Sequence, residues 1–265
     1  MNILGFDTNK IENKIGHEVY EACVSTGRVV VLLQDTLRFL ATANIKETLR
    51  QMAKLGTDSL PIVAMTTMFT GMVLAVQTAK EFIRFGAAES VGGVVAIAMG
   101  RELAPVLAGV VVAGRIGAAI AAEIGTMKVT EQIDALRVMA TNPVSYLVVP
   151  RFLAMVLMLP ILIIFANAVG SIGGGVVATN YADISSNIYI TSIRTFMEPW
   201  DLIGGMIKGA FFGAIIAIIG CYKGLRAKQG AEGVGIATTS SVVTSIILIF
   251  VCNYFLSVIL YVTGG

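Results

Sequence analysis

The chain has 265 residues, of which 56% are hydrophobic and only 14% are charged, and its formal net charge is +2. Soluble domains carry about 25% charged residues, so this composition excludes an ordinary soluble domain and indicates a single domain embedded in lipid. No basic stripe suggests nucleic acid as a partner. Three widely spaced cysteines, Cys23, Cys221 and Cys252, form neither a disulfide framework nor a metal motif.

The N-terminal region is polar. We expect residues 1–15 to be frayed and residues 16–41 to form an amphipathic helix, because apolar side chains from Tyr20 to Leu37 recur at helical spacing. Such a helix lies flat on the lipid headgroups or packs on a soluble partner, and its apolar neighbours favour the first interpretation. The first 20 residues contain no continuous apolar stretch and therefore do not resemble a signal peptide.

Five strongly apolar segments follow, and each is long enough for the roughly 20 residues that cross the hydrocarbon of a bilayer. The second and third are too long for one upright crossing, and we expect Pro105 and Pro160 to kink them. A hairpin in the second segment, which would give a sixth crossing, is the alternative. The sequence thus predicts an all-α integral membrane protein with five transmembrane helices, at about 60–79, 91–124, 147–178, 202–222 and 242–262.

The distribution of lysine and arginine predicts the orientation. Thirteen of these residues lie on the side of the N-terminus, against three on the opposite side, Lys80, Arg84 and Arg194. Cytoplasmic loops carry the excess of positive charge. We therefore expect a cytoplasmic N-terminus and a C-terminus on the outer, periplasmic side.

Glycines recur every fourth residue in two of the segments, at Gly205, Gly209 and Gly213 and at Gly170 and Gly174. Small residues at this spacing let helices approach closely in lipid. The spacing alone leaves open whether the contact is internal or between subunits, although internal packing is the commoner case.

Several catalytic motifs are absent. The sequence contains no G-x-x-x-x-G-K-[ST] phosphate loop, so we expect no ATP binding by that route and no cofactor held by this chain. The single histidine, His17, lies in the polar N-terminal region, which excludes a histidine-based triad or metal site within the membrane. No segment carries the paired carboxylates that an intramembrane enzyme would need. We predict no catalytic residues and no metal ligands.

Four charged residues interrupt the apolar segments: Arg101, Glu102, Arg115 and Lys208. Charges within lipid are costly, so they mark cavities, ion pairs or functional sites. Arg101 and Glu102 are adjacent and should point in different directions. They form either a polar patch facing a substrate cavity or structural pairs with other helices or a second subunit, unless they snorkel to an interface. For Arg115 and Lys208 snorkelling or packing is the favoured interpretation.

The loop between the second and third segments, residues 123–139, is the most distinctive polar stretch. We expect Thr130 to cap a short helix exposed to the cytosol. This helix would be either a docking element or an ordinary connecting helix on the headgroups. Its predicted apolar edge is formed by Ile133, Leu136 and Met139, among the charged residues Glu131, Asp134 and Arg137.

Two blocks of sequence carry a family resemblance. The first contains the runs 100–107, 113–119, 122–127, 130–136, 142–143 and 149–152, and the second contains 232–235, 237–239 and 242–245. Both blocks closely resemble the MlaE-type permease family. The resemblance covers roughly residues 45–262, so that 1–45 forms an N-terminal interfacial helix region and 46–265 an MlaE-type permease transmembrane domain. Lys80, Glu81 and Arg84 make the end of the first segment more charged than the family pattern.

The resemblance implies a homodimeric ABC transporter permease in the inner membrane of a double-membrane cell. Its implied partners are a cytoplasmic ATPase dimer that uses ATP, an outer MCE-domain substrate-binding protein and, in some systems, a small STAS-domain protein, with phospholipid as the cargo moved between the membranes. The coupling residues would be Thr130, Glu131, Asp134, Leu136, Arg137 and Met139. The lipid cavity would be lined by Met72, Val76 and Gln77 of the first span and Phe255 of the fifth, with Arg101 and Glu102 close by.

Three other functions compete with this hypothesis. An ion-coupled secondary transporter needs intramembrane acids, for which Glu102 is the single strong candidate. An intramembrane lipid enzyme lacks the expected histidine and carboxylate pairs. A non-transporting membrane scaffold would be distinguished by the absence of bound lipid from a purified complex.

Overall fold

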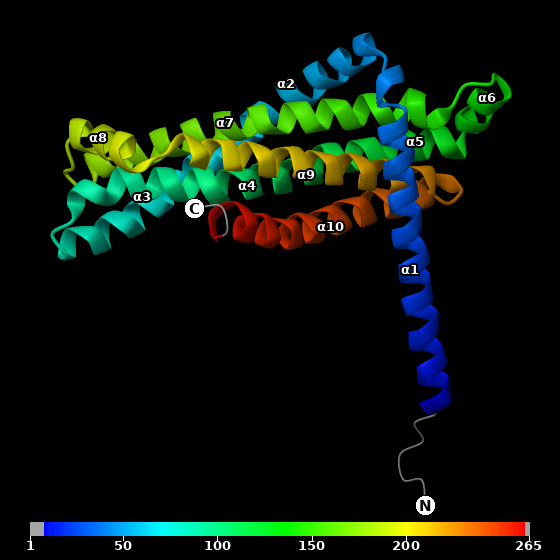
Figure 1. The fold of residues 1–265 in the computed structure, drawn as a ribbon, viewed down its shortest axis with the longest axis horizontal. Helices are drawn as coiled ribbons and strands as arrows, with labels where there is room; N and C mark the ends of the chain where they lie inside the picture. Colours follow the sequence, from blue (N-terminus) through cyan, green and yellow to red (C-terminus); the bar gives the residue numbers. More distant parts are fainter. Residues whose placement is uncertain (1–7, 263–265) are drawn as a thin grey trace, which may run out of the picture.

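The computed structural model describes the backbone of residues 8–262, and within that range it is helical without any strand. Its long helices run along one axis and form an elongated bundle (Figure 1). The helices are α1 (Thr8–Arg38), α2 (Ile45–Arg84), α3 (Val91–Ala98), α4 (Ala104–Val112), α5 (Ala118–Val129), α6 (Gln132–Val138), α7 (Val149–Asn180), α8 (Ser186–Phe196), α9 (Pro199–Leu225) and α10 (Gly230–Ser257). Short 3-10 turns (Leu40–Thr42 and Ala88–Ser90) and π-helical turns (Met99–Leu103, Ala113–Gly117, Val144–Val148 and Val258–Val262) connect or extend them.

Five helical segments are long and apolar enough to cross a membrane, which confirms the predicted helical membrane fold. Each is longer than predicted, because the helices continue into the more polar sequence at their ends. The segments are Ile45–Arg84, Ala88–Val129, Val144–Asn180, Pro199–Leu225 and Gly230–Tyr261.

The second of these segments is a single continuous path, so the alternative of a hairpin with a sixth crossing is wrong. Two π-helical turns, Met99–Leu103 and Ala113–Gly117, interrupt α3, α4 and α5 without reversing the chain. The first turn ends two residues before Pro105, which has no N–H to continue the regular ladder. Pro160, in contrast, lies inside the continuous helix α7.

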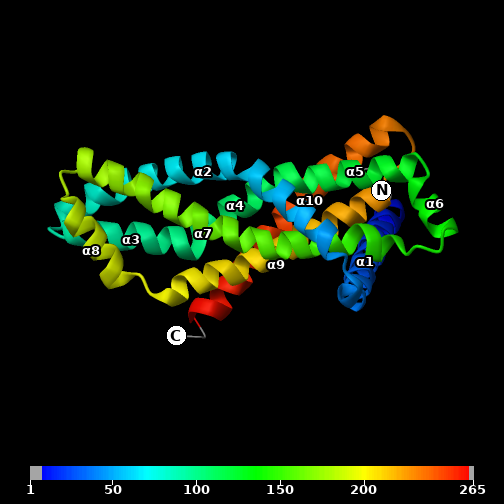
Figure 2. The ribbon, with the colours of Figure 1, turned by 90° about the horizontal axis from the view of Figure 1, so that it is seen from above.

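Helix α1 begins at Thr8, so the expectation of a frayed segment is wrong for residues 8–15; residues 1–7 lie outside the described range. The helix ends at Arg38, three residues before the predicted end. It crosses one end of the bundle at a steep angle to the long helices (Figures 1 and 2). A helix in that position lies across the end of the bundle and does not run parallel to the membrane-spanning helices.

The predicted small-residue faces pack within the chain. A side chain at Gly71 of α2 would collide with the backbone carbonyl of Gly170 on α7. On α9, a Cβ at Gly205 would stand 2.6 Å from the carbonyl oxygen of Gly100, and one at Gly213 would collide with the backbone of Met155 on α7. Gly71 and Gly213 therefore let α7 lie directly against α2 and α9, and Gly205 lets α9 lie against the first π-helical turn.

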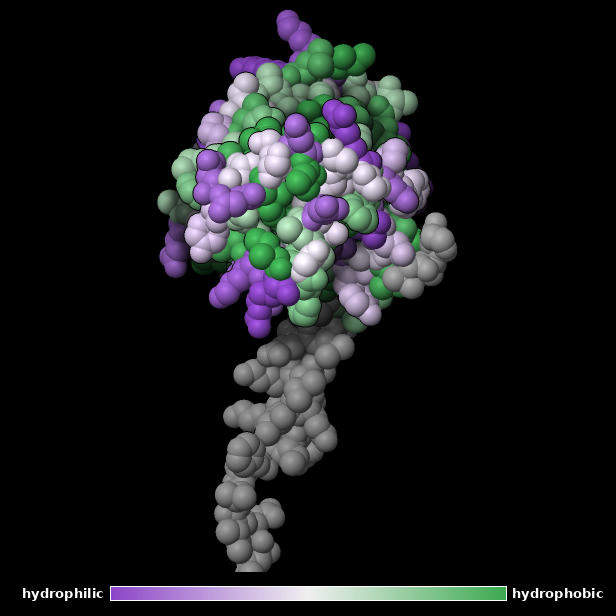
Figure 3. Space-filling model, turned by 90° about the vertical axis from the view of Figure 1, so that its left-hand side faces the viewer, coloured by the Kyte–Doolittle hydropathy of each residue, from purple (hydrophilic) through white to green (hydrophobic). Residues whose placement is uncertain are grey.

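The outer surface is unevenly covered. Helices α2 and α10 are the least buried of the membrane-spanning helices, and both present large apolar side chains to the outside, including Phe69 and Val73 on α2 and Phe250 and Tyr254 on α10. The end formed by α3 and α8 has a mixed surface, on which hydrophilic and hydrophobic residues alternate (Figure 3). The apolar flanks suit lipid or another subunit, and the mixed end suits water.

Candidate functional site

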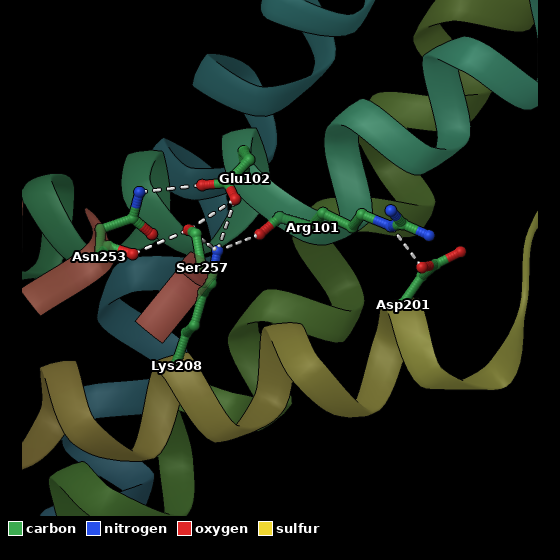
Figure 4. Close-up of polar contacts among 6 residues, drawn as sticks. All are labelled: Arg101, Glu102, Asp201, Lys208, Asn253 and Ser257. Carbon is green, nitrogen blue, oxygen red and sulfur yellow. Dashed lines mark hydrogen bonds and ion pairs between the residues drawn. The ribbon is translucent and has the colours of Figure 1, made fainter. Parts of the chain in front are cut away.

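A polar cluster lies in the middle of the bundle, where α10 and α9 meet the first π-helical turn (Figure 4). The Nζ atom of Lys208 lies 2.8 Å from Oε1 of Glu102 and 2.8 Å from Oγ of Ser257. The Ser257 hydroxyl donates to the same Oε1 at 2.7 Å, and Nδ2 of Asn253 donates to Oε2 at 2.9 Å. The lysine side chain is fully buried, whereas 41% of the glutamate side chain is exposed. The cluster thus neutralises a buried cation and leaves part of a carboxylate accessible.

Lys208 also donates to the backbone carbonyl oxygen of Arg101 at 2.7 Å. In a regular helix that oxygen would accept from the N–H of residue 105, which is Pro105. The proline therefore frees a backbone acceptor, and the lysine of another helix satisfies it. This bond ties α9 to the irregular part of the second span.

The Arg101 side chain points away from Glu102, as expected for adjacent helical residues (Figure 4). Its Nε donates to Oδ1 of Asp201 at 2.5 Å. Asp201 is fully buried and also accepts from the backbone N–H of Glu198, in a capping box at the start of α9. The guanidinium lies 4.9 Å from the ring centre of Tyr261, and 37% of the side chain remains exposed.

Of the two interpretations of Arg101 and Glu102, the structure shows the ion pairs with another helix. Snorkelling is wrong for Lys208, because its side chain is fully buried and its ammonium is bonded in the centre of the bundle. Whether the exposed parts of Arg101 and Glu102 face a substrate stays a prediction. Sequence reasoning missed four members of the cluster: Asp201, Asn253, Ser257 and Tyr261.

The other predicted cavity residues lie on two separate helices of the monomer. Val76 and Gln77 are exposed and Met72 is partly buried on α2, while Phe255 is 59% exposed on α10. Helices α2 and α10 both pack against α4 and do not pack extensively against each other. One chain therefore does not bring these four side chains together, and a shared cavity would require a second copy.

The fourth intramembrane charge, Arg115, lies on the second π-helical turn and is exposed. No ion pair with it is found among the residues whose side chains are described. The same residues contain no group of three acidic, histidine or cysteine side chains suited to a metal ion.

The predicted cytoplasmic helix is present as α6, but Thr130 does not cap it. Helix α5 continues to Val129, so the Thr130 hydroxyl donates back to the carbonyl of Thr126 at 2.8 Å. The N-cap position is instead held by Glu131, whose φ of 59° lies in the left-handed region. Ala140, two residues beyond the helix, also has a positive φ of 54°. Two strained links thus fix the direction of a seven-residue helix.

The apolar residues of α6 face in two directions, some toward the bundle and some toward the outside. Ile133 is buried and Leu136 packs partly against the bundle core, while Met139 is exposed. The neighbouring Val138 is 89% exposed and was not singled out from the sequence. An exposed apolar side chain at the tip of the bundle is available to a partner.

The acidic side of α6 is held by two cations. Asp134 accepts from Nζ of Lys128 at 2.9 Å and from Nη1 of Arg137 at 3.1 Å. The hydrogen bond from Lys128 is the main cause that lowers the pKa of Asp134 below its usual value. Glu131 is exposed. Their roles in ATPase coupling stay predictions.

Comparison with known proteins identifies the family of this chain. The family model described as Permease MlaE matches residues 48–259. A probable ABC transporter permease protein of Synechocystis sp. is 49% identical over 222 residues, which cover 84% of each chain. One from Rickettsia prowazekii is 50% identical, over 79% of this chain and 81% of its own. The chloroplastic protein TRIGALACTOSYLDIACYLGLYCEROL 1 of Arabidopsis thaliana is 42% identical, over 89% of this chain and 68% of its own. This chain belongs to the MlaE permease family and is a multi-pass membrane permease.

Proposed function

We propose that the chain is the membrane-spanning subunit of an ABC-type transporter that moves phospholipid between the inner and outer membranes. It works as a homodimer with a cytoplasmic ATPase dimer and an MCE-domain protein on the outer side, and a small STAS-domain protein is a further candidate component. The permease family supports the coarse assignment. The Arabidopsis relative is named after a lipid, which supports a lipid as the cargo.

The observation that carries this proposal is the pairing of a charged cluster with exposed apolar flanks. A phospholipid needs a polar contact for its headgroup and apolar surface for its chains. Arg101, beside the start of α9, and Glu102, beside Lys208 and α10, keep part of their side chains exposed. Phe255 and its neighbours on α10, together with Val76 on α2, offer apolar surface. A dimer that faces these helices toward each other would enclose an amphiphilic cavity.

The position of α1 supports the proposed orientation. The helix crosses the end of the bundle that also carries α6 and the α9–α10 turn (Figure 1). That end has most of the lysines and arginines, as expected of a cytoplasmic side. We place α1 flat at the cytoplasmic headgroups of the inner membrane and the C-terminus on the periplasmic side.

The proposed mechanism is mechanical. The partner ATPase binds and hydrolyses ATP, and its closing pushes α6 through contacts with Glu131, Val138 and Met139. Helix α6 is short and its ends are fixed by left-handed links, so it transmits the push to α5 rather than bending. The movement of α5 narrows the cavity between the two copies and changes its access to lipid.

The test is purification of the full-length protein, co-expressed with its genomic neighbours, in mild detergent. ATPase activity and bound phospholipid are then measured in the same eluate, the lipid by mass spectrometry. A co-eluting ATPase with bound phospholipid supports the proposal. Transport that persists without an ATPase supports an ion-coupled transporter, and a folded protein with neither ATPase nor lipid supports a scaffold.

A matched pair of variants locates the lipid. Phe255→Ala and Phe211→Ala each remove one phenyl ring that is 59% and 50% exposed, respectively. We expect bound lipid to fall in Phe255→Ala and to stay at the native level in Phe211→Ala, which lies on α9. Equal lipid content in the two variants would contradict a cavity wall at α10.

A further inference from the structure

A pocket of about 260 Å³ lies at the α6 end of the bundle, between α1 and the α9–α10 turn. Three cationic side chains line it, Lys223, Arg226 and Lys228, and none of the lining residues that the structure describes is acidic. Glu232, in the first turn of α10, is exposed but does not line the pocket. Among its described lining residues, the pocket therefore gathers three cations and no carboxylate.

The turn that carries these cations is built by two glycines. Gly230 adopts a φ of 86°, which side chains rarely tolerate. A Cβ at Gly233 would collide with the carbonyl oxygen of Lys228, so the turn can fold back onto α10 only at a glycine. Arg226 is oriented by a hydrogen bond, in which its Nη1 donates to the hydroxyl oxygen of Tyr222 at 2.7 Å. The guanidinium is thus held in place before any ligand arrives.

The rest of the lining is mixed. Ser25 of α1 and Ser240 of α10 supply hydroxyl groups, while Ile236 and Ala237 of α10 supply apolar surface. Ile236 is 57% exposed on the flank of the bundle that we assign to lipid or a second subunit. A ligand in this pocket could place an anionic group among the cations and an apolar part along α10.

We propose that this pocket binds the phosphate of an anionic glycerophospholipid from the surrounding leaflet, as a resident lipid separate from the transported one. Arginine and lysine recognise phosphate by charge-assisted hydrogen bonds, and basic pockets between membrane helices on this side bind anionic headgroups. Free phosphate shares the same chemistry, but the apolar part of the lining favours a lipid. The pocket lies about 28 Å along α10 from Phe255, since Ile236 precedes that residue by nineteen positions, so it is distinct from the proposed transport cavity.

The test measures binding of dihexanoyl phosphatidylglycerol to the full-length protein in a neutral detergent, by isothermal calorimetry. The comparison ligands are dihexanoyl phosphatidylcholine and inorganic phosphate. The pocket variant is K223Q/R226Q/K228Q. Its control, K80Q/R84Q/R194Q, removes the same charge from the opposite end. A second variant, Tyr222→Phe, removes only the hydroxyl that orients Arg226 and keeps the ring.

We expect the pocket variant to weaken phosphatidylglycerol binding by at least about tenfold, and the control variant to leave it within about twofold of native. Tyr222→Phe should weaken binding by a smaller factor, which tests the site even if the triple variant folds poorly. Phe211→Ala should leave this binding unchanged. Co-purifying phospholipid is measured separately in Phe255→Ala, so failure of the transport proposal and failure of this one are separable.

Three results would overturn the proposal. Equal affinity for phosphatidylcholine would show that net anionic charge is not recognised, and equal affinity for inorganic phosphate would show a free-anion site. Unchanged lipid binding in the pocket variant, with loss of ATPase co-purification, would assign the cations to protein docking instead.

Discussion

The ammonium of Lys208 lies 2.7 Å from the carbonyl oxygen of Arg101, an oxygen that Pro105 leaves without its usual backbone donor. The same ammonium is paired with Glu102. One buried ammonium therefore pairs with a carboxylate and also donates to a backbone carbonyl that lacks its helical donor. Removing it would leave both groups without this partner.

Replacing Lys208 alone should be costly. Lys208→Met leaves Glu102 without its cation and the Arg101 carbonyl without a donor, and loss of one partner of a buried pair costs about 3–5 kcal/mol. We expect the low end, because the glutamate is partly exposed. Thermal unfolding of the purified protein measures the loss. The double variant Lys208→Met/Glu102→Met should recover part of it, and an additive loss would contradict the pairing.

Pro105 and Lys208 should be energetically coupled. Pro105→Ala restores an N–H that can donate to the Arg101 carbonyl, so Lys208→Met should cost less in that background. Residues sharing a partner typically show coupling of about 0.5–3 kcal/mol. A double-mutant cycle on thermal stability checks this. Strict additivity would mean that the lysine–carbonyl bond does not depend on the proline.

The exposed tip of α6 should determine ATPase binding. Val138→Asp places a charge on a side chain that is 89% exposed, so the fold should survive while ATPase co-purification falls several-fold. Charge reversal at Glu131 and Asp134 together should have a similar effect. Phe85→Asp, at the 82% exposed α2–α3 turn of the opposite end, is the control and should retain the ATPase. Normal co-purification and transport in the α6 variants would contradict the docking role.

The Asp134–Lys128 contact should survive moderate acid. Because the bond from Lys128 lowers the pKa of Asp134 in the folded protein, the contact stabilises the α5–α6 link above the ordinary carboxyl pKa of 3.8. That stabilisation is lost as the pH falls through the lowered folded value. Lys128→Met should move the loss to higher pH. Hydrogen exchange of residues 130–139, corrected for intrinsic rates, measures it; identical pH profiles for both proteins would contradict the assignment.

Two glycine substitutions should distinguish a glycine that a helix contact requires from one that no contact requires. Gly71→Ala places a methyl group against the backbone of Gly170 and must push α2 away from α7. Gly114→Ala meets no atom within 4 Å among the described residues beyond its own helical turn. We expect a clear fall in the unfolding temperature for the first and little change for the second. A large effect at Gly114 would indicate that this position contacts a second subunit.

The helical spans could be predicted from the sequence because the thickness of the bilayer hydrocarbon sets the length and the apolar content of a membrane-spanning helix. The sequence also predicted that Arg101 and Glu102 diverge, since that follows from helical geometry. It did not predict Lys208 as the partner of Glu102, because 106 residues separate them and only the packing of α9 brings them together. Asp201 was missed because its position after Pro199 resembles an ordinary helix start.

The cap at Thr130 was predicted from a local pattern and was wrong for a local reason. Helix α5 runs one turn further than expected, which makes Thr130 its end and passes the cap position to Glu131. Hydrophobic periodicity identified Ile133, Leu136 and Met139 as one edge, but it could not separate the residues that face the bundle from those that face outward. Val138 became a candidate only when its exposure was known.

The length of the second span has a consequence for the path of any cargo. Its 42 residues extend about 60 Å, twice the thickness of the hydrocarbon, while α10 ends well short of the α3–α8 end (Figure 1). At the α3–α8 end, the second span therefore reaches beyond the end of α10 and forms a rim on that side of the bundle (Figure 1). Arg101 lies about 20 Å below that rim. Under the proposed function, a lipid headgroup bound beside Arg101 would therefore pass along this protein wall before it leaves the bundle.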